Sequence, residues 1–254
     1  MKPTFLEYEK PLLCAMIQND TPEKCIEKIK KSLEDGAEAL GIQLCKLKTE
    51  YRNEKDIRRI FEACDGKPIY ITSYRHGDNK TDEICAELLL MGARCGATLC
   101  DVMGDMFGRS PYYELTVDET AINRQKELIE KIHALGCEVL MSSHTSLKNI
   151  SCGECEMIAK AHIERGADII KIVNRAESKA VIPQYLEAIQ KITAMTDKKL
   201  LLLVSGEGQI VRYIGPSFGV CMYLCVAYHE PCDTAEQPVL KKIKAVRDNL
   251  RFDI

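Results

Sequence analysis

The sequence lacks the features of a membrane protein, a nucleic-acid-binding protein or a dinucleotide-binding fold. No apolar run reaches the ~18 residues of a membrane span, and the first residues contain no apolar core of signal-peptide length. The formal net charge is only −3, so there is no basic footprint for nucleic acid or an anionic membrane. No Gly-x-Gly-x-x-Gly loop follows the first predicted strand. These absences predict a cytoplasmic protein that acts on a small molecule.

Cysteine, by contrast, is abundant, with thirteen residues spread through apolar stretches. Such a number indicates a disulfide scaffold only in a short secreted chain, whereas this chain has 254 residues. We therefore expect buried, reduced thiols. Cys152-Gly-Glu-Cys155 has thioredoxin-like spacing, but no second cysteine pair accompanies it, so chance is the better interpretation than a metal or redox site.

Short apolar runs alternate with amphipathic segments about eight times along the chain. The runs are nearly continuous in Leu, Ile and Val, as in strands buried on both faces. The predicted strands are 12–17, 39–44, 68–73, 97–102, 138–142, 168–173, 200–204 and 219–226. The predicted helices are 22–36, 56–63, 81–91, 118–135, 152–165, 183–195 and 240–250. The pattern predicts an α/β fold, a single (β/α)8 TIM barrel over residues 1–254, with an open doubly wound sheet as the alternative.

In a barrel of this kind, the carboxyl ends of the strands face the active site. Lys171 lies in the apolar run Gly166-Ala-Asp-Ile-Ile-Lys-Ile-Val, and His144 follows the strand before it. A lysine in an Ile/Val strand needs a partner or a depressed pKa, and a buried neutral amine can form a Schiff base. A nearby imidazole can then remove and return a proton. A solvated lysine and a structural histidine remain the alternative on geometry alone.

Arg212 follows the glycine-rich loop 205–208. This placement predicts a guanidinium at the rim of the barrel that captures a carboxylate through two hydrogen bonds. A phosphate is the other anion that such a loop could hold. A surface arginine with no ligand is equally consistent with the sequence.

Two segments resemble the type I 3-dehydroquinate dehydratase family, namely Val139-Leu-Met-Ser-Ser-His144 and Gly166-Ala-Asp-Ile-Ile-Lys171-Ile. The order and spacing fit over roughly residues 135–240, including Arg212 and the later Gln237. The resemblance implies that Lys171 is the imine-forming nucleophile and His144 the general acid and base. It also implies a carboxylate clamp made by Arg212 and Gln237, with no metal or organic cofactor.

The first half of the chain departs from this family. Gly41-Ile-Gln43 stands where the family has a Glu-x-Arg pair, and Tyr74 stands at the family's strand-three arginine, with Arg75 next to it. These are the groups that would hold ring hydroxyls. A site that has lost them discriminates poorly between hydroxylated rings, so the substrate need not be 3-dehydroquinate itself.

Two further departures concern the histidine and the lid. The family's histidine-orienting glutamate falls at Met103, which leaves Asp105 as a substitute two residues on. The serine of the late lid has no clear counterpart, although Thr234 could serve.

The sequence therefore predicts a dehydratase-like lyase that acts on a carboxylated ketone through an imine at Lys171. An imine-forming aldolase that holds a phosphate through Arg212 and the loop 205–208 is the second hypothesis. A barrel that has lost activity and binds a ligand is the third. The sequence does not fix the oligomeric state, although many barrels dimerise through surface helices, so a homodimer is the expectation.

Overall fold

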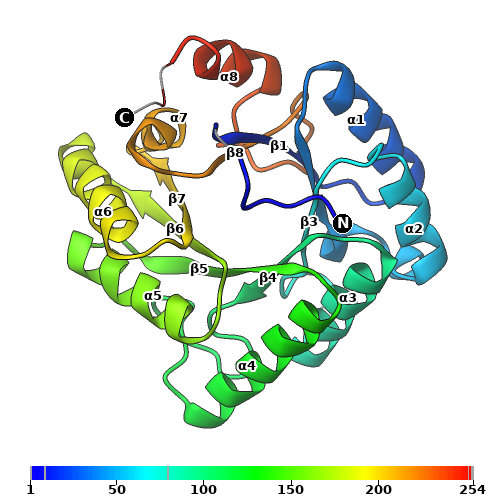
Figure 1. Ribbon diagram of the computed structural model, residues 1–254, viewed down its shortest axis with the longest axis horizontal. Coiled ribbons are helices and arrows are strands. Elements are labelled where there is room, and N and C mark those ends of the chain that lie inside the picture. The colour runs from blue at the N-terminus through cyan, green and yellow to red at the C-terminus, as the bar shows by residue number, and fades with distance from the viewer. Residues whose placement is uncertain (1, 9, 79, 251, 253–254) are drawn as a thin grey trace. The chain divides into compact units, whose positions relative to one another are not determined.

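The computed structural model describes residues 2–8, 10–78, 80–250 and 252. Strands and helices alternate along the chain, and the strands join one eight-stranded sheet in the order β7-β6-β5-β4-β3-β2-β1-β8 (Figure 1). The strands are Leu12–Ile17 (β1), Ala39–Gln43 (β2), Ile69–Thr72 (β3), Leu99–Met103 (β4), Glu138–Lys148 (β5), Ile169–Ala176 (β6), Lys199–Gly206 (β7) and Met222–Cys225 (β8). The helices are Pro22–Glu34 (α1), Glu54–Glu62 (α2), Asp82–Cys95 (α3), Glu119–Ala134 (α4), Cys152–Glu164 (α5), Ile182–Met195 (α6), Val211–Ile214 (α7) and Leu240–Arg247 (α8). This parallel α/β arrangement confirms the predicted TIM-barrel class.

β1 has the predicted bounds, and among the other strands β5, β6 and β8 differ most from the prediction. β5 and β6 continue past the predicted ends at 142 and 173, because β6 keeps its pairing with β7 as far as Ala176 opposite Gly206. His144 therefore lies within a strand and not at the start of a loop, and Lys171 lies within its strand as predicted. β8 begins later than predicted, because residues 215–218 form a 3-10 helix that ends at Gly219 in a left-handed conformation.

The chain divides into two compact units. The first unit comprises Met1–Asp101, Glu130–Glu138 and Tyr223–Leu250, and the second consists mainly of Val102–Ile129 and Val139–Met222. Whether residues 1–254 behave as a single domain remains a prediction. In the described part of the chain, no helix is long and apolar enough to cross a membrane.

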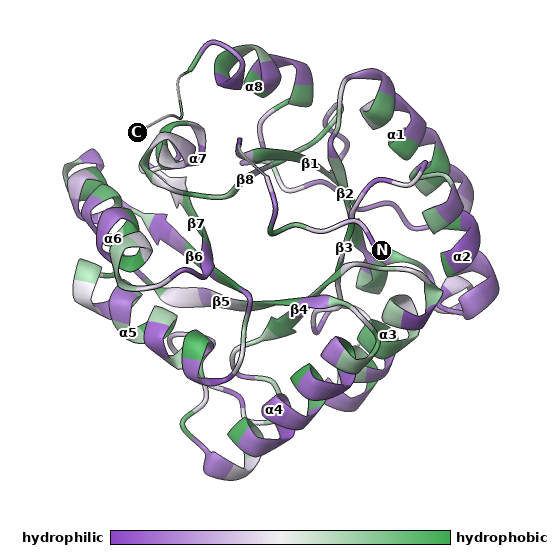
Figure 2. Ribbon diagram, viewed as in Figure 1, coloured by the Kyte–Doolittle hydropathy of each residue, from purple (hydrophilic) through white to green (hydrophobic). Residues whose placement is uncertain are grey.

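In the first unit, β1, β2 and β3 pair in parallel. Helix α1 begins at Pro22, and the hydroxyl of Thr21 caps it by accepting from the backbone N–H of Lys24. The strands are mainly apolar, whereas the helices carry both hydrophilic and hydrophobic residues (Figure 2). The core of this unit thus lies on and around the strands, which fixes the positions of the residues at their carboxyl ends.

In the second unit, β5, β6 and β7 pair in parallel, and α5 contacts both β6 and α6. Helix α5 starts with a capping box between Ser151 and Glu154, which satisfies two backbone N–H groups. As predicted, the thirteen cysteines are free thiols, and most of them are buried, although Cys232 is exposed.

Candidate active site

Lys171 and His144 project from neighbouring strands to the same face of the sheet in the second unit. Lys171 on β6 is the register partner of Ser142 on β5, and His144 lies two residues beyond Ser142. Side chains alternate along a strand, so residues two apart share a face. Strand spacing and rise place the two Cα atoms ~8 Å apart. A small substrate could therefore contact both functional groups.

The burial of these side chains differs as their proposed roles require. Lys171 is only 4% exposed, whereas the side chain of His144 is 36% exposed. Ser143 precedes His144 on β5 and points to the opposite face of the sheet. Its Oγ lies 3.0 Å from Nε2 of His162 on helix α5. That contact confirms the alternation on β5 and places His144 on the face of Lys171.

Glu114 is the carboxylate that orients His144. Its Oε2 lies 2.6 Å from Nδ1 of the imidazole and also accepts a hydrogen bond from the backbone N–H of His144. A carboxylate at Nδ1 favours the tautomer in which Nδ1 carries the proton and Nε2 presents a lone pair. Nε2 is therefore the nitrogen that suits proton exchange with a substrate.

The loop between β4 and α4 holds Glu114 in place. Arg165, 6% exposed at the end of α5, donates to the carbonyl oxygens of Gly104 at 2.7 Å and Thr116 at 2.5 Å. The carbonyl of Glu114 accepts from Oγ of Ser143 at 3.0 Å. Glu114 has φ +46°, a left-handed conformation that costs a non-glycine residue about 1–2 kcal/mol. The anchored loop sustains this conformation.

The sequence did not reveal the role of Glu114. The sequence predicts that Asp105, two residues after Met103, could orient the histidine, but in the structure Nδ1 of His144 contacts Glu114. Asp105 is 4% exposed and accepts from the backbone N–H of Ser110 at 3.0 Å, and Met103 is buried. The signal available in the sequence was a long connection between β4 and α4, a length that often marks a functional loop.

Arg212 is buried near the carboxyl end of β7, so it is not a solvated surface arginine. Its side chain belongs to the short helix α7 and is 7% exposed, with Nε donating to the carbonyl of Val204 near the end of β7 at 2.9 Å. Gly206 has φ +67°, and a Cβ there would lie 2.4 Å from the carbonyl oxygen of Ala176. This tight turn brings α7 back against β7, where the carbonyl of Val204 holds Nε of Arg212.

The strand-two and strand-three candidates lie in the first unit. A Cβ on Gly41 would lie 2.2 Å from Sδ of Met16, so the family's glutamate would fit here only if the Met16 side chain moved. Gln43 is half-buried on the same strand face as Gly41. Tyr74 donates from its hydroxyl to Oδ2 of the buried Asp101 at 2.6 Å.

Arg75 and the late candidates also belong to the first unit. Nε of Arg75 lies 2.6 Å from Oδ1 of Asp82, the first residue of α3. Gln237 is 6% exposed, and its Oε1 accepts from Nε2 of Gln18 at 3.0 Å. Oγ1 of Thr234 donates to Oε1 of the same Gln18 at 3.0 Å. In the described part of the chain, no group of three or more His, Cys, Asp or Glu side chains is arranged to hold a metal ion.

A sequence model of the type I 3-dehydroquinases matches residues 13–252. The chain belongs to this family. It is a carbon–oxygen lyase of the 3-dehydroquinate dehydratase type, an activity of the shikimate pathway of aromatic amino acid biosynthesis. No curated protein sequence matches the chain significantly.

Solved structures of dehydratases share the fold at low sequence identity. The type I 3-dehydroquinate dehydratase of Clostridium difficile, with covalently modified comenic acid, is 18% identical, with a TM-score of 0.82 over 98% of each chain. The Geobacillus kaustophilus enzyme is 14% identical, with a TM-score of 0.79 over 94% of this chain and 91% of that one. The Enterococcus faecalis enzyme is 15% identical, with a TM-score of 0.78 over 99% of this chain and 100% of that one. These identities support the fold, whereas the family rests on the sequence model.

Proposed function

We propose that this lyase dehydrates 3-dehydroquinate or a related carboxylated cyclic ketone through an imine at Lys171. The observation that carries the proposal is the shared strand face of Lys171 and His144, with Glu114 against Nδ1 of the histidine. An amine and an oriented imidazole on one face are the two groups that an imine-based elimination needs.

The reaction follows from these groups. The neutral amine of Lys171 adds to the ketone, and loss of water gives an iminium that acidifies the adjacent C–H bond. Nε2 of His144 removes that proton, and the electron pair forms an enamine. The enamine expels the β-hydroxyl, which leaves as water after His144 returns the proton. Hydrolysis of the conjugated imine releases the enone product and the free lysine.

We assign the carboxylate of the substrate to Arg212, with Gln237 and Thr234 as further contacts implied by the family resemblance. Nε of Arg212 donates to the carbonyl of Val204, which fixes the plane of the guanidinium, and a planar guanidinium suits recognition of a carboxylate. The other candidates from the sequence remain proposals as contacts to the ring, namely Gln43, Tyr74, Arg75, Met103 and Asp105.

Borohydride reduction in the presence of ketone, followed by peptide mass spectrometry, tests the imine. We expect 3-dehydroquinate, or another ketone from a carboxylated panel, to leave a reduced adduct on Lys171. The Lys171→Ala variant should lose the adduct, and Lys199→Ala, which removes a half-buried lysine of β7, should keep it. If no ketone in the panel modifies Lys171, the proposal is wrong. Adducts with sugar phosphates alone would favour the aldolase hypothesis instead.

We further propose that the enzyme works as a homodimer in the cytoplasm. Thirteen free thiols support a reducing compartment. Light scattering of the purified protein would measure the oligomeric state, and a monomer at micromolar concentration would contradict the dimer.

A further inference from the structure

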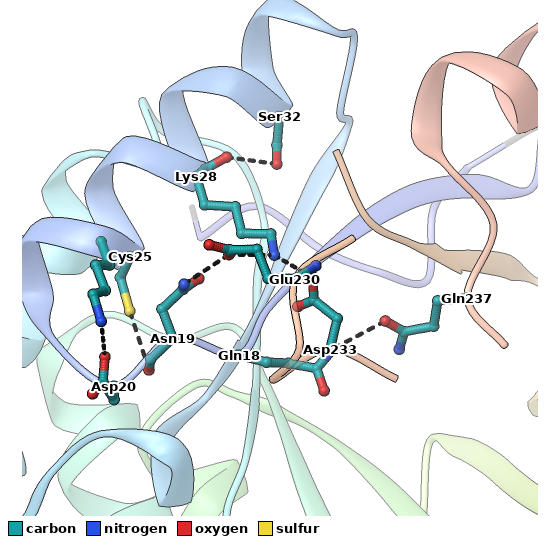
Figure 3. Close-up of polar contacts among 10 residues, drawn as sticks. Gln18, Asn19, Asp20, Cys25, Lys28, Ser32, Glu230, Asp233 and Gln237 are labelled. Carbon is teal, nitrogen blue, oxygen red and sulfur yellow. Dashed lines mark hydrogen bonds and ion pairs between the residues drawn. The ribbon is translucent and has the colours of Figure 1, made fainter. Parts of the chain in front are cut away.

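The loop between β8 and α8, residues 226–239, carries Thr234 and Gln237. Side chains from two earlier parts of the chain contact this loop, namely from helix α1 and from the residues just after β1 (Figure 3). We call this segment the β8–α8 loop. It contains no long helix or strand, so these side-chain contacts determine where its functional residues lie.

Lys28 of α1 anchors the middle of the loop. Its side chain is 0% exposed, and its Nζ lies 2.9 Å from Oε2 of Glu230 and 2.5 Å from Oδ2 of Asp233. Burial by itself would lower the pKa of Lys28, but the hydrogen bonds that its ammonium donates to Asp233 and Glu230 outweigh burial and raise that pKa. A buried ammonium is stable only with such partners, so the pair of carboxylates must stay close to α1.

Two further hydrogen bonds hold Glu230 and Asp233 in place. Nδ2 of Asn19 donates to Oε2 of Glu230 at 2.9 Å. Oδ2 of Asp233 accepts from the backbone N–H of Glu230 at 2.8 Å, which closes a tight turn over residues 230–233. The turn is therefore held both internally and by Lys28.

Gln18, just beyond β1, determines which way the amide of Gln237 faces. It is 3% exposed, its Nε2 donates to Oε1 of Gln237, and its Oε1 accepts from Oγ1 of Thr234. With Oε1 of Gln237 occupied by a donor, the NH2 group of that amide is the end that can donate to a carboxylate.

We propose that Lys28 and Gln18 are positioning residues for substrate binding. Lys28 holds the β8–α8 loop in the binding conformation, and Gln18 orients Gln237 so that its NH2 group meets the substrate carboxylate. The second part rests on the proposed function, because it requires Gln237 to contact the substrate.

Amide hydrogen exchange tests the anchor without any substrate. In Lys28→Met, peptides covering 228–236 should exchange roughly tenfold faster than in the wild type, and Lys28→Arg should restore most of the protection. Lys31→Met is the matched control, because Lys31 lies on the same helix but pairs with Asp35 and Glu34. If Lys28→Met does not fold, Glu230→Gln can replace it. This change removes the charge of Glu230, a partly buried carboxylate partner of Lys28, and it should also speed the exchange. Unchanged exchange in the folded variant overturns the anchor.

A catalytic double-mutant cycle tests the role of Gln18. Gln18→Met should raise KM roughly tenfold with a much smaller change in kcat, since a lost hydrogen bond to a charged group has about this effect. In a Gln237→Met background, the same change should have almost no further effect on KM. Equal effects in both backgrounds would mean that Gln18 does not act through Gln237, which overturns the proposal. If no carboxylated ketone is turned over at all, the proposed function fails, and the exchange experiment still decides the role of Lys28.

Discussion

Replacement of Glu114 by glutamine is the sharpest test of the dyad formed by His144 and Glu114. Glutamine keeps the length of the side chain, so its carbonyl oxygen can still accept from Nδ1 of His144. What it removes is the charge. The backbone at Glu114 is already left-handed at φ +46°, and glutamine adopts that conformation no more easily than glutamate, so the stability of the loop should not change.

The size of the effect follows from the hydrogen bond. A bond to a charged partner contributes about 1.5–3 kcal/mol, and a neutral one about 0.5–1.5 kcal/mol. The difference is about 1–1.5 kcal/mol, or roughly 5- to 13-fold in kcat. The Glu114 side chain is 17% exposed and that of His144 is 36% exposed, so partial solvation favours the lower end of this range.

The assay is steady-state turnover of 3-dehydroquinate, followed by the absorbance of the conjugated enone product. We expect kcat to fall by this factor in Glu114→Gln, with KM nearly unchanged and borohydride trapping of Lys171 retained. Glu119→Gln, which changes an exposed glutamate in the first turn of α4, is the control. An unchanged kcat in Glu114→Gln, together with a large loss in a folded Asp105→Asn variant, would refute the assignment of the dyad.

Three other predictions concern the carboxylate site, the loop and a thiol. Arg212→Lys should raise KM roughly 10- to 100-fold, because lysine cannot both bond Val204 and bind a carboxylate in bidentate fashion; titration of KM checks this. Gly104→Ala should lower the free energy of unfolding by about 1–3 kcal/mol in urea melts and also lower kcat, since the new Cβ would lie 2.6 Å from the carbonyl of Glu114. A hydrogen bond with the Cys100 thiol, and then the charge of Lys2, lower the pKa of Cys137 from 9.0 to about 7. The native state thus releases this proton at lower pH than the unfolded chain, so the free energy of unfolding should rise as the pH rises from 7 to 9. Urea melts of Cys137→Ala should show a flatter slope.

The strand pattern was readable because it depends on neighbours along the chain. Continuous Leu, Ile and Val runs bounded by capped helices predicted the eight strands, and the same runs placed Lys171 and His144 on neighbouring strands. The sequence did not determine what distant segments decide. β6 extends to Ala176 only because β7 offers a partner there, and Arg212 is buried because the turn at Gly206 folds α7 back onto β7.

The sequence by itself thus determined the fold class, the family and the lysine–histidine pair, since these follow from spacings of a few residues within each element. Only the tertiary structure decided which carboxylate meets His144 and what holds the β8–α8 loop. Glu114 and His144 are 30 positions apart, and Lys28 and Glu230 are 202 positions apart. No local periodicity links such residues, because a hydrogen bond or ion pair between them depends on how the loops fold over the strand ends.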